Sequence, residues 1–127
     1  MLFESEVFDT RFEKPASWSD HFFRYCEFSN IDTKGGDVDS VFIGCRIENC
    51  EWYWGLFNGA LFLNVTFKGC VFRGTAFAGS KFIECDFIDC RFIKDNLNAD
   101  CSFDDIAWYG CTQRNCPGLE QEFRSRR

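Results

Sequence analysis

The sequence predicts a solenoid, a fold in which a short unit repeats along an axis and packs against the next. Three observations predict it: a large apolar residue at every fifth position through most of the chain, small residues two places earlier, and nine cysteines that all fall on the small positions. Neither an α-helix, with about 3.6 residues per turn, nor a strand, with about two, produces a period of five. The repeat therefore has to be defined before any helix or strand is assigned.

The large positions are most regular in the middle of the chain. The twelve predicted core residues are Phe42, Ile47, Trp52, Phe57, Phe62, Phe67, Phe72, Phe77, Phe82, Phe87, Phe92 and Leu97. Two places before each lies a second lattice, from Ser40 to Asp95, and eleven of its twelve members are no larger than valine. One large and one small inward side chain per unit suit a narrow tube, because protein interiors pack at nearly crystalline density.

These units resemble those of the pentapeptide-repeat family, which carry a central Phe or Leu and a small residue two places earlier. The resemblance is carried by CVFRG (70–74), SKFIE (80–84), CDFID (85–89) and CRFIK (90–94). It implies an all-β fold, a right-handed quadrilateral β-helix with four units per coil and one unit on each side of a square. About five coils are expected, which would make a rod roughly 25 Å long at ~4.8 Å per strand.

The period slips at both ends of this regular block. Upstream, one residue is missing between Val38 and Phe42, and downstream one extra residue is needed near 98–100. We expect a single domain over 1–127, with regular repeats over about 16–108, an irregular N-terminal cap over 1–15 with a loop at Lys14–Pro15, and a C-terminal cap over 109–127. Pro117-Gly118 and the following LEQEFRSRR predict a short capping helix, because an open coil end would leave strand edges unpaired.

Composition and charge narrow the classes of function. No stretch approaches the roughly 18 apolar residues of a membrane-spanning helix. The acidic N-terminus does not resemble a signal peptide, so a cytoplasmic protein is expected. Of the net charge of −6, most lies in residues 1–40, with nine acids and four bases, whereas residues 41–100 hold seven acids and six bases. This balance argues against direct nucleic-acid binding, which requires a basic surface.

The nine cysteines are interpreted as reduced thiols that fill the small inward positions. A zinc site would favour closely paired cysteines with histidine partners, but the pairs at 45/50, 85/90 and 111/116 are separated by four residues and the chain has one histidine. Disulfides between stacked cysteines are compatible with the strand spacing but improbable in the cytoplasm. With four units per coil, Cys111 is expected to join the column of Cys50, Cys70 and Cys90, next to a column of Cys26, Cys45 and Cys85.

Catalysis is not expected. A tube filled by its own side chains offers no pocket in which titratable groups converge. His21 is expected to be structural, and its nearest thiol, Cys26, should point inward. The glycines mark the corners between units rather than a phosphate loop: Gly44, Gly59, Gly69, Gly74 and Gly79. We therefore predict a non-enzymatic protein without catalytic residues, cofactor or metal.

The outward side chains then carry the function. Stacking residues twenty apart predicts one contiguous apolar stripe, made of Phe22, Val41, Ile43, Leu61, Leu63 and Ile83. Monomers rarely expose such a patch without a use for it, although β-branched residues also satisfy strand preference alone. In addition, the cluster Trp52-Tyr53-Trp54 departs from the pattern and indicates a local bulge that turns an aromatic ring outward.

We predict a protein-interaction module with an unknown protein partner, or a homodimer formed through the same apolar face. The family resemblance implies one alternative, because some members protect type II topoisomerases such as gyrase by imitating DNA with an acidic rod. Here the acidity lies at one end and the regular coils are nearly neutral. A further alternative is a structural or immunity-type partner of a larger protein.

Overall fold

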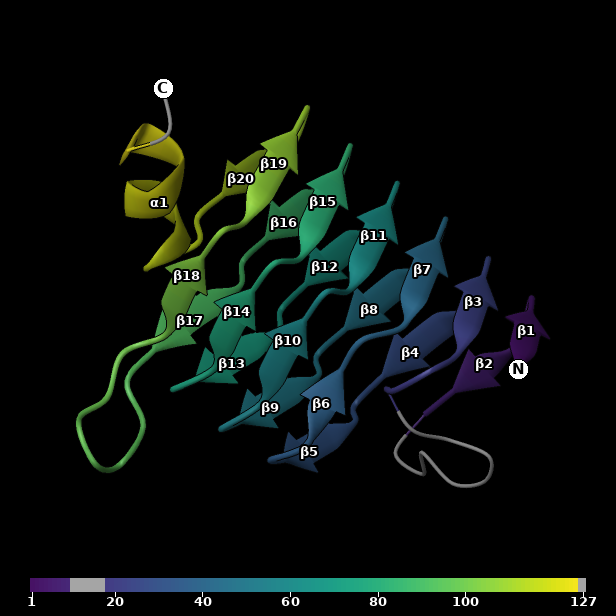
Figure 1. Cartoon of the computed structure of the whole chain (residues 1–127), viewed down its shortest axis with the longest axis horizontal. Coiled ribbons are helices and arrows are strands. Elements are labelled where there is room, and N and C mark those ends of the chain that lie inside the picture. The colour runs from purple at the N-terminus through teal and green to yellow at the C-terminus, as the bar shows by residue number, and fades with distance from the viewer. Residues whose placement is uncertain (10–17, 126–127) are drawn as a thin grey trace.

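The protein is described by a computed structural model that covers residues 1–9 and 18–125 (Figure 1). Within these residues the chain winds through short parallel β-strands that stack into four flat sheets, here called faces A to D. Face A contains β1 (Leu2–Glu4), β3 (Phe22–Arg24), β7 (Val41–Ile43), β11 (Leu61–Leu63), β15 (Lys81–Ile83) and β19 (Ala107–Tyr109). Face B contains β2 (Val7–Phe8), β4 (Glu27–Ser29), β8 (Arg46–Glu48), β12 (Thr66–Lys68), β16 (Asp86–Ile88) and β20 (Thr112–Arg114).

Two shorter sheets complete the square. Face C contains β5 (Asp32–Lys34), β9 (Glu51–Tyr53), β13 (Val71–Arg73) and β17 (Arg91–Ile93). Face D contains β6 (Asp37–Val38), β10 (Leu56–Asn58), β14 (Ala76–Ala78) and β18 (Ser102–Asp104). The chain visits faces A, B, C and D in turn, so face A lies opposite face C. The expected all-β quadrilateral β-helix is confirmed. Of the coils in the described residues, four are complete, with half a coil at each end, where about five coils were expected.

The middle residue of each strand points into the tube and stacks on its counterpart in the next coil. The rings of Phe62 and Phe82 are 4.8 Å apart and tilted by 2°, and Phe67 and Phe87 are 4.7 Å apart at the same tilt. Eleven of the twelve predicted core residues are buried: Phe42, Ile47, Trp52, Phe57, Phe62, Phe67, Phe72, Phe77, Phe82, Phe87 and Phe92. Such offset aromatic stacking adds roughly 0.5–1.5 kcal/mol per pair beyond the burial itself.

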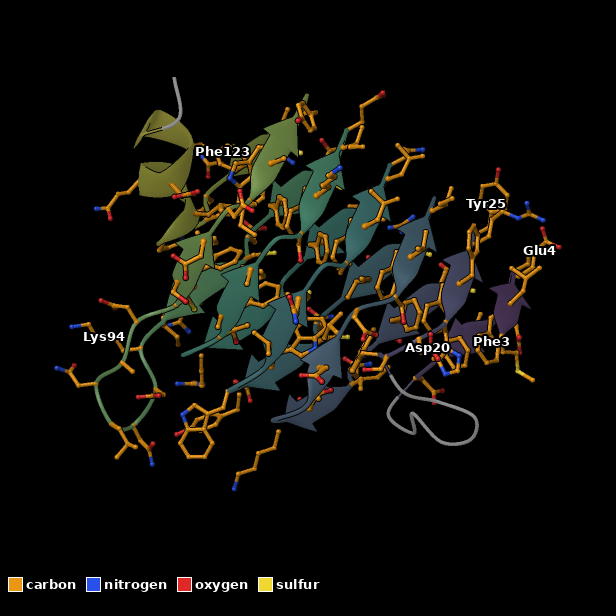
Figure 2. The ribbon with its side chains drawn as sticks, in the orientation of Figure 1. Phe3, Glu4, Asp20, Tyr25, Lys94 and Phe123 are labelled. Atoms are coloured by element: carbon orange, nitrogen blue, oxygen red, sulfur yellow. The ribbon has the colours of Figure 1, made fainter. Side chains whose placement is uncertain are left out.

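Leu97 is the exception, and its assignment to the core is wrong. Its side chain is 76% exposed in a loop that projects from the rod after β17, where Lys94 is labelled (Figures 1 and 2). Phe103 pairs with Phe77, an offset of 26 residues where a regular coil has 20. The downstream irregularity is therefore an insertion of six residues rather than one.

The upstream slip is confirmed, because Phe57 pairs with Val38 at an offset of 19 residues. The expected irregular cap over 1–15 is wrong for residues 2–8, since β1 and β2 pair in register with β3 and β4. The loop expected at Lys14–Pro15 lies outside the described residues.

The C-terminal end is closed by the predicted helix, α1 (Leu119–Ser125). The coil pattern continues through β20, so the cap begins later than the expected boundary at 109. Leu119 is fully buried, and the ring of Phe123 packs 4.9 Å from that of Trp108 (Figure 2). No helix of the described chain has the length and apolarity that crossing a bilayer requires.

Candidate functional site

The six residues of the predicted apolar stripe all lie on face A. In-register pairing places Phe22, Val41 and Leu61 in one column, and Ile43, Leu63 and Ile83 in the other. Phe22 is 36% exposed and the remaining five are partly exposed. The stripe is therefore continuous across β3, β7, β11 and β15.

The apolar surface extends further than the sequence indicated. Leu2 pairs with Phe22 at one end, and Tyr109 pairs with Ile83 at the other, each more than half exposed. Sequence reasoning missed both, because they lie beyond the two irregular segments and their face could not be assigned. Of the twelve outward positions on the strands of face A, nine are apolar or aromatic and three are charged: Glu4, Arg24 and Lys81.

The adjacent face B is different. Its strands carry eleven outward side chains, of which Val7 and Ile88 are apolar and the others polar or charged. The propensity of β-branched and aromatic residues to form strands is the same on all four faces, so it does not explain why apolar residues gather on face A.

A second candidate site is a recess of about 320 Å³ on face C, next to the inserted loop. Trp54 occupies the corner after β9, with a φ of +59° and 40% of its surface exposed. In the cluster Trp52-Tyr53-Trp54, the ring expected to turn outward is therefore that of Trp54, whereas Trp52 is buried and stacks on Phe72. The recess is lined by Asp32, Thr33, Lys34, Glu51, Tyr53, Trp54 and Asn96.

The recess is held in shape by the loop. The indole Nε1 of Trp54 donates a 2.6 Å hydrogen bond to Asp95, and the hydroxyl of Tyr53 donates to the side chain of Asn96. Hydrogen bonds from the Ala99 amide, and then from Trp54 and the Leu97 amide, hold the pKa of Asp95 below its usual range. Because this folded-state pKa is lowered, the ionised carboxylate stabilises the loop at neutral pH, and that contribution is lost on acidification.

Gly74 leaves the space that the Trp54–Asp95 contact needs. It lies at the equivalent corner one coil further along, with a φ of +53°. A Cβ atom there would come within 2.7 Å of the Asp95 carboxylate. The Asp95 carboxylate therefore excludes a side chain at this corner, although non-glycine residues such as Trp54 adopt the same backbone conformation at other corners.

Comparison with known proteins accounts for this architecture. A family model described as pentapeptide repeats, in nine copies, matches residues 57–107. The solved structure of QnrB1, a plasmid-mediated fluoroquinolone resistance protein, superposes with a TM-score of 0.65 at 14% identity, over 91% of this chain and 69% of that one. The pentapeptide-repeat protein Rfr23 from the cyanobacterium Cyanothece 51142 superposes with the same TM-score at 9% identity, over 91% and 82%.

Residues 57–107 match the pentapeptide-repeat family, and the chain shares the fold of these two solved structures. At these low identities the two structures establish the fold alone. No curated protein sequence matches the chain.

In this solenoid all nine cysteines are free thiols, and seven are buried. Eight of the nine Sγ atoms lie within hydrogen-bonding distance of a carbonyl oxygen of the preceding coil, as Cys45 Sγ does of Phe23 at 3.5 Å. The expected column of Cys111 is wrong: Cys111 lies above Cys85, and Cys116 lies above Cys90. The insertion has six residues and not the expected one, so every later residue lies one face away from its expected position.

The pentapeptide-repeat fold gives His21 and Cys26 structural positions. The His21 ring packs edge-on against Phe3 at 5.2 Å, and the buried Cys26 thiol donates to the Phe3 carbonyl oxygen. Across the described ranges, no three His, Cys, Asp or Glu side chains are placed to hold a metal ion.

Cys111 is expected to be the most reactive thiol of the native protein. It is partly exposed, and a hydrogen bond from Cys85 lowers its pKa to about 7, whereas burial raises the pKa of the similarly exposed Cys101. Iodoacetamide should therefore label Cys111 first, with a rate that rises as pH increases through about 7, because the thiolate is the nucleophile. Mass spectrometry of pulse-labelled native protein measures this rate.

Two variants serve as controls for the thiol experiment. Cys111→Ser should remove the fast labelling phase, and Cys85→Ala should move its pH midpoint upward by removing the donor. An unchanged midpoint in Cys85→Ala would contradict the assigned role of Cys85.

Proposed function

We propose that this protein is a non-enzymatic interaction module that binds a protein partner through face A. The proposal rests on the concentration of apolar side chains there, nine of twelve outward positions over six strands. Six strands at ~4.8 Å and three residues at ~3.3 Å give a surface of roughly 300 Å². An apolar patch of this order on a monomer is often functional.

The size of the surface favours a different protein as the partner over a second copy. Stable dimers bury about 800 Å² per partner, more than twice the area of the apolar patch. A homodimer held by this patch alone would therefore be weak. A partner that also contacts the corners beside face A would add the missing area.

Charge distribution makes a DNA-mimicking protector of a type II topoisomerase, such as gyrase, the second candidate. The strands together carry eight acidic and eight basic side chains, so the described faces are neutral in sum. The excess acidity lies at corners and loops. A rod that imitates DNA needs rows of negative charge along its faces, and for this reason the interaction module is the preferred proposal.

The test is a comparison of two arginine substitutions on the same coil. Leu63→Arg places a charge in the middle of face A, and Thr66→Arg places the same charge on face B. A charge buried against an apolar partner surface costs several kcal/mol, so Leu63→Arg should reduce partner capture at least about tenfold. Quantitative affinity capture from native cells, with a photo-crosslinker at Leu61, measures the difference.

The wild type and Thr66→Arg should capture the same partner in equal amounts. Both variants should retain the wild-type circular dichroism spectrum, since neither replaces a core residue. Equal capture by all three proteins would show that the apolar residues of face A reflect only their propensity to form strands and do not bind the partner.

A further inference from the structure

We propose that the face C recess binds a guanidinium group, as carried by an arginine side chain of a protein or peptide. Because face C lies opposite face A, this site is separate from the proposed interaction face, and either proposal stands without the other.

An aromatic surface in the recess already holds a cation. The ammonium group of Lys34 lies 5.8 Å from the centroid of the Trp54 ring, within the range of a cation–π interaction. The Tyr53 ring meets the Trp54 ring edge-on at 4.3 Å, which adds a second aromatic wall. Lys34 is exposed, so an incoming cation can displace it from the indole.

Carboxylates stand beside this aromatic pair. Asp32 and Glu51 are paired in register on β5 and β9, and both line the recess. Glu51 accepts a 2.9 Å hydrogen bond from Arg73. Among the described residues no ion pair involves Asp32. A carboxylate without a cation therefore lies next to an aromatic surface that attracts one.

The charge of the surrounding chain also favours a cationic ligand. β5 is the first strand of face C, at the acidic end of the rod, where residues 1–9 and 18–40 hold eight acids and two bases. The negative potential of this end would raise the local concentration of a cation.

The recess is already formed without a ligand. Its two aromatic side chains are fixed by hydrogen bonds to Asp95 and Asn96, residues more than forty positions away in the sequence. In addition, Trp54 adopts the left-handed backbone conformation, which costs a non-glycine residue roughly 1–2 kcal/mol.

Guanidinium fits this arrangement better than ammonium does. Its flat face stacks on an indole, and its fork of N–H donors pairs with a carboxylate at the same time. Trp54 and Asp32 offer both kinds of contact within one recess.

The experiment is a titration of the full chain with N-acetyl-arginine methylamide, followed by the ¹⁵N–¹H resonance of the Trp54 indole. Its neutral isostere, N-acetyl-citrulline methylamide, is titrated in parallel at equal ionic strength. The arginine probe should shift the indole resonance in a saturable way, with a Kd in the millimolar range expected for a ligand of this size. The citrulline probe should not.

Three variants decide whether the site has the proposed chemistry. Lys34→Gln removes the competing internal cation and should tighten arginine binding about two- to fivefold. Lys81→Gln, on the opposite face A, changes the net charge equally and should leave the affinity unchanged. Asp32→Asn should weaken binding about two- to fivefold.

Equal binding of the arginine and citrulline probes would overturn the proposal. So would an identical affinity in Lys34→Gln and Lys81→Gln, since a purely structural Lys34–Trp54 contact predicts no gain. All three substituted residues are exposed on strands, so the variants are expected to fold.

Discussion

Phe72→Ala is expected to lower the free energy of unfolding by about 3–5 kcal/mol, as the removal of a buried aromatic ring does. The Phe72 ring is 1% exposed and lies between Trp52, at 5.0 Å, and Phe92, at 4.6 Å, nearly parallel to both. Both neighbours are fixed by backbone ladders on either side. The tube therefore cannot collapse around the missing ring, and most of the cavity remains.

Urea unfolding monitored by circular dichroism measures this change. Leu97→Ala is the matched control, because it removes a residue that has the same place in the five-residue lattice but is exposed in the inserted loop. It should change the free energy of unfolding by less than about 0.5 kcal/mol. Similar losses for the two variants would mean that the inserted loop has been placed wrongly.

Gly118→Ala is expected to detach the C-terminal cap and to cost about 2 kcal/mol or more. Gly118 has a φ of +94°, where a side chain is strained by roughly 1–3 kcal/mol. Its added Cβ would lie 2.3 Å from the carbonyl oxygen of Phe92, a backbone atom that cannot move aside. The amide of Phe92 also donates to the Pro117 carbonyl oxygen at 2.9 Å, so the clash would break a hydrogen bond between cap and coil.

Hydrogen exchange of the α1 amides and urea unfolding together measure the loss of the cap. Gly59→Ala separates the backbone strain from the clash with Phe92. Gly59 also has a positive φ, +70°, but an added Cβ there would have nothing within 4 Å. It should cost about 1 kcal/mol and leave exchange in α1 unchanged. If Gly118→Ala were no more costly than Gly59→Ala, the contact with Phe92 would not hold the cap.

The five-residue period predicted a packed tube and eleven of its core residues, and the four units per coil that the family resemblance implies placed six residues of the apolar surface on one face. Each of these depends on a residue's place in the repeat and not on its particular neighbours. The corner positions were predictable for the same reason, and Gly44, Gly59, Gly69, Gly74 and Gly79 all have positive φ.

The inserted loop could not be located in the same way. Leu97 is apolar and lies five residues after Phe92, so it satisfies the lattice by sequence alone. What removes it from the core is the turn at Asp95, whose carboxylate accepts hydrogen bonds from the amides of Leu97 and Ala99. The polar Asp95 at a small inward position was the one sequence signal of this turn.

The recess was beyond sequence reasoning because its parts come from coils that the repeat treats as equivalent. Trp54 reaches Asp95 across Gly74 only because that corner has no side chain. Such a contact depends on the particular side chains at two stacked corners and at the start of the inserted loop. A repeat predicts which residues are stacked, but it does not predict which of them touch.

The six-residue loop after β17 shows how this architecture accommodates change in chain length. The strands on both sides of it remain in register, since β18 pairs with β14 and β17 pairs with β13 along their full lengths. A corner can thus gain residues while the ladder on each side stays intact. Evolution can add a new recognition element at a corner without redesigning the rod, and an engineer could graft a peptide at the same place.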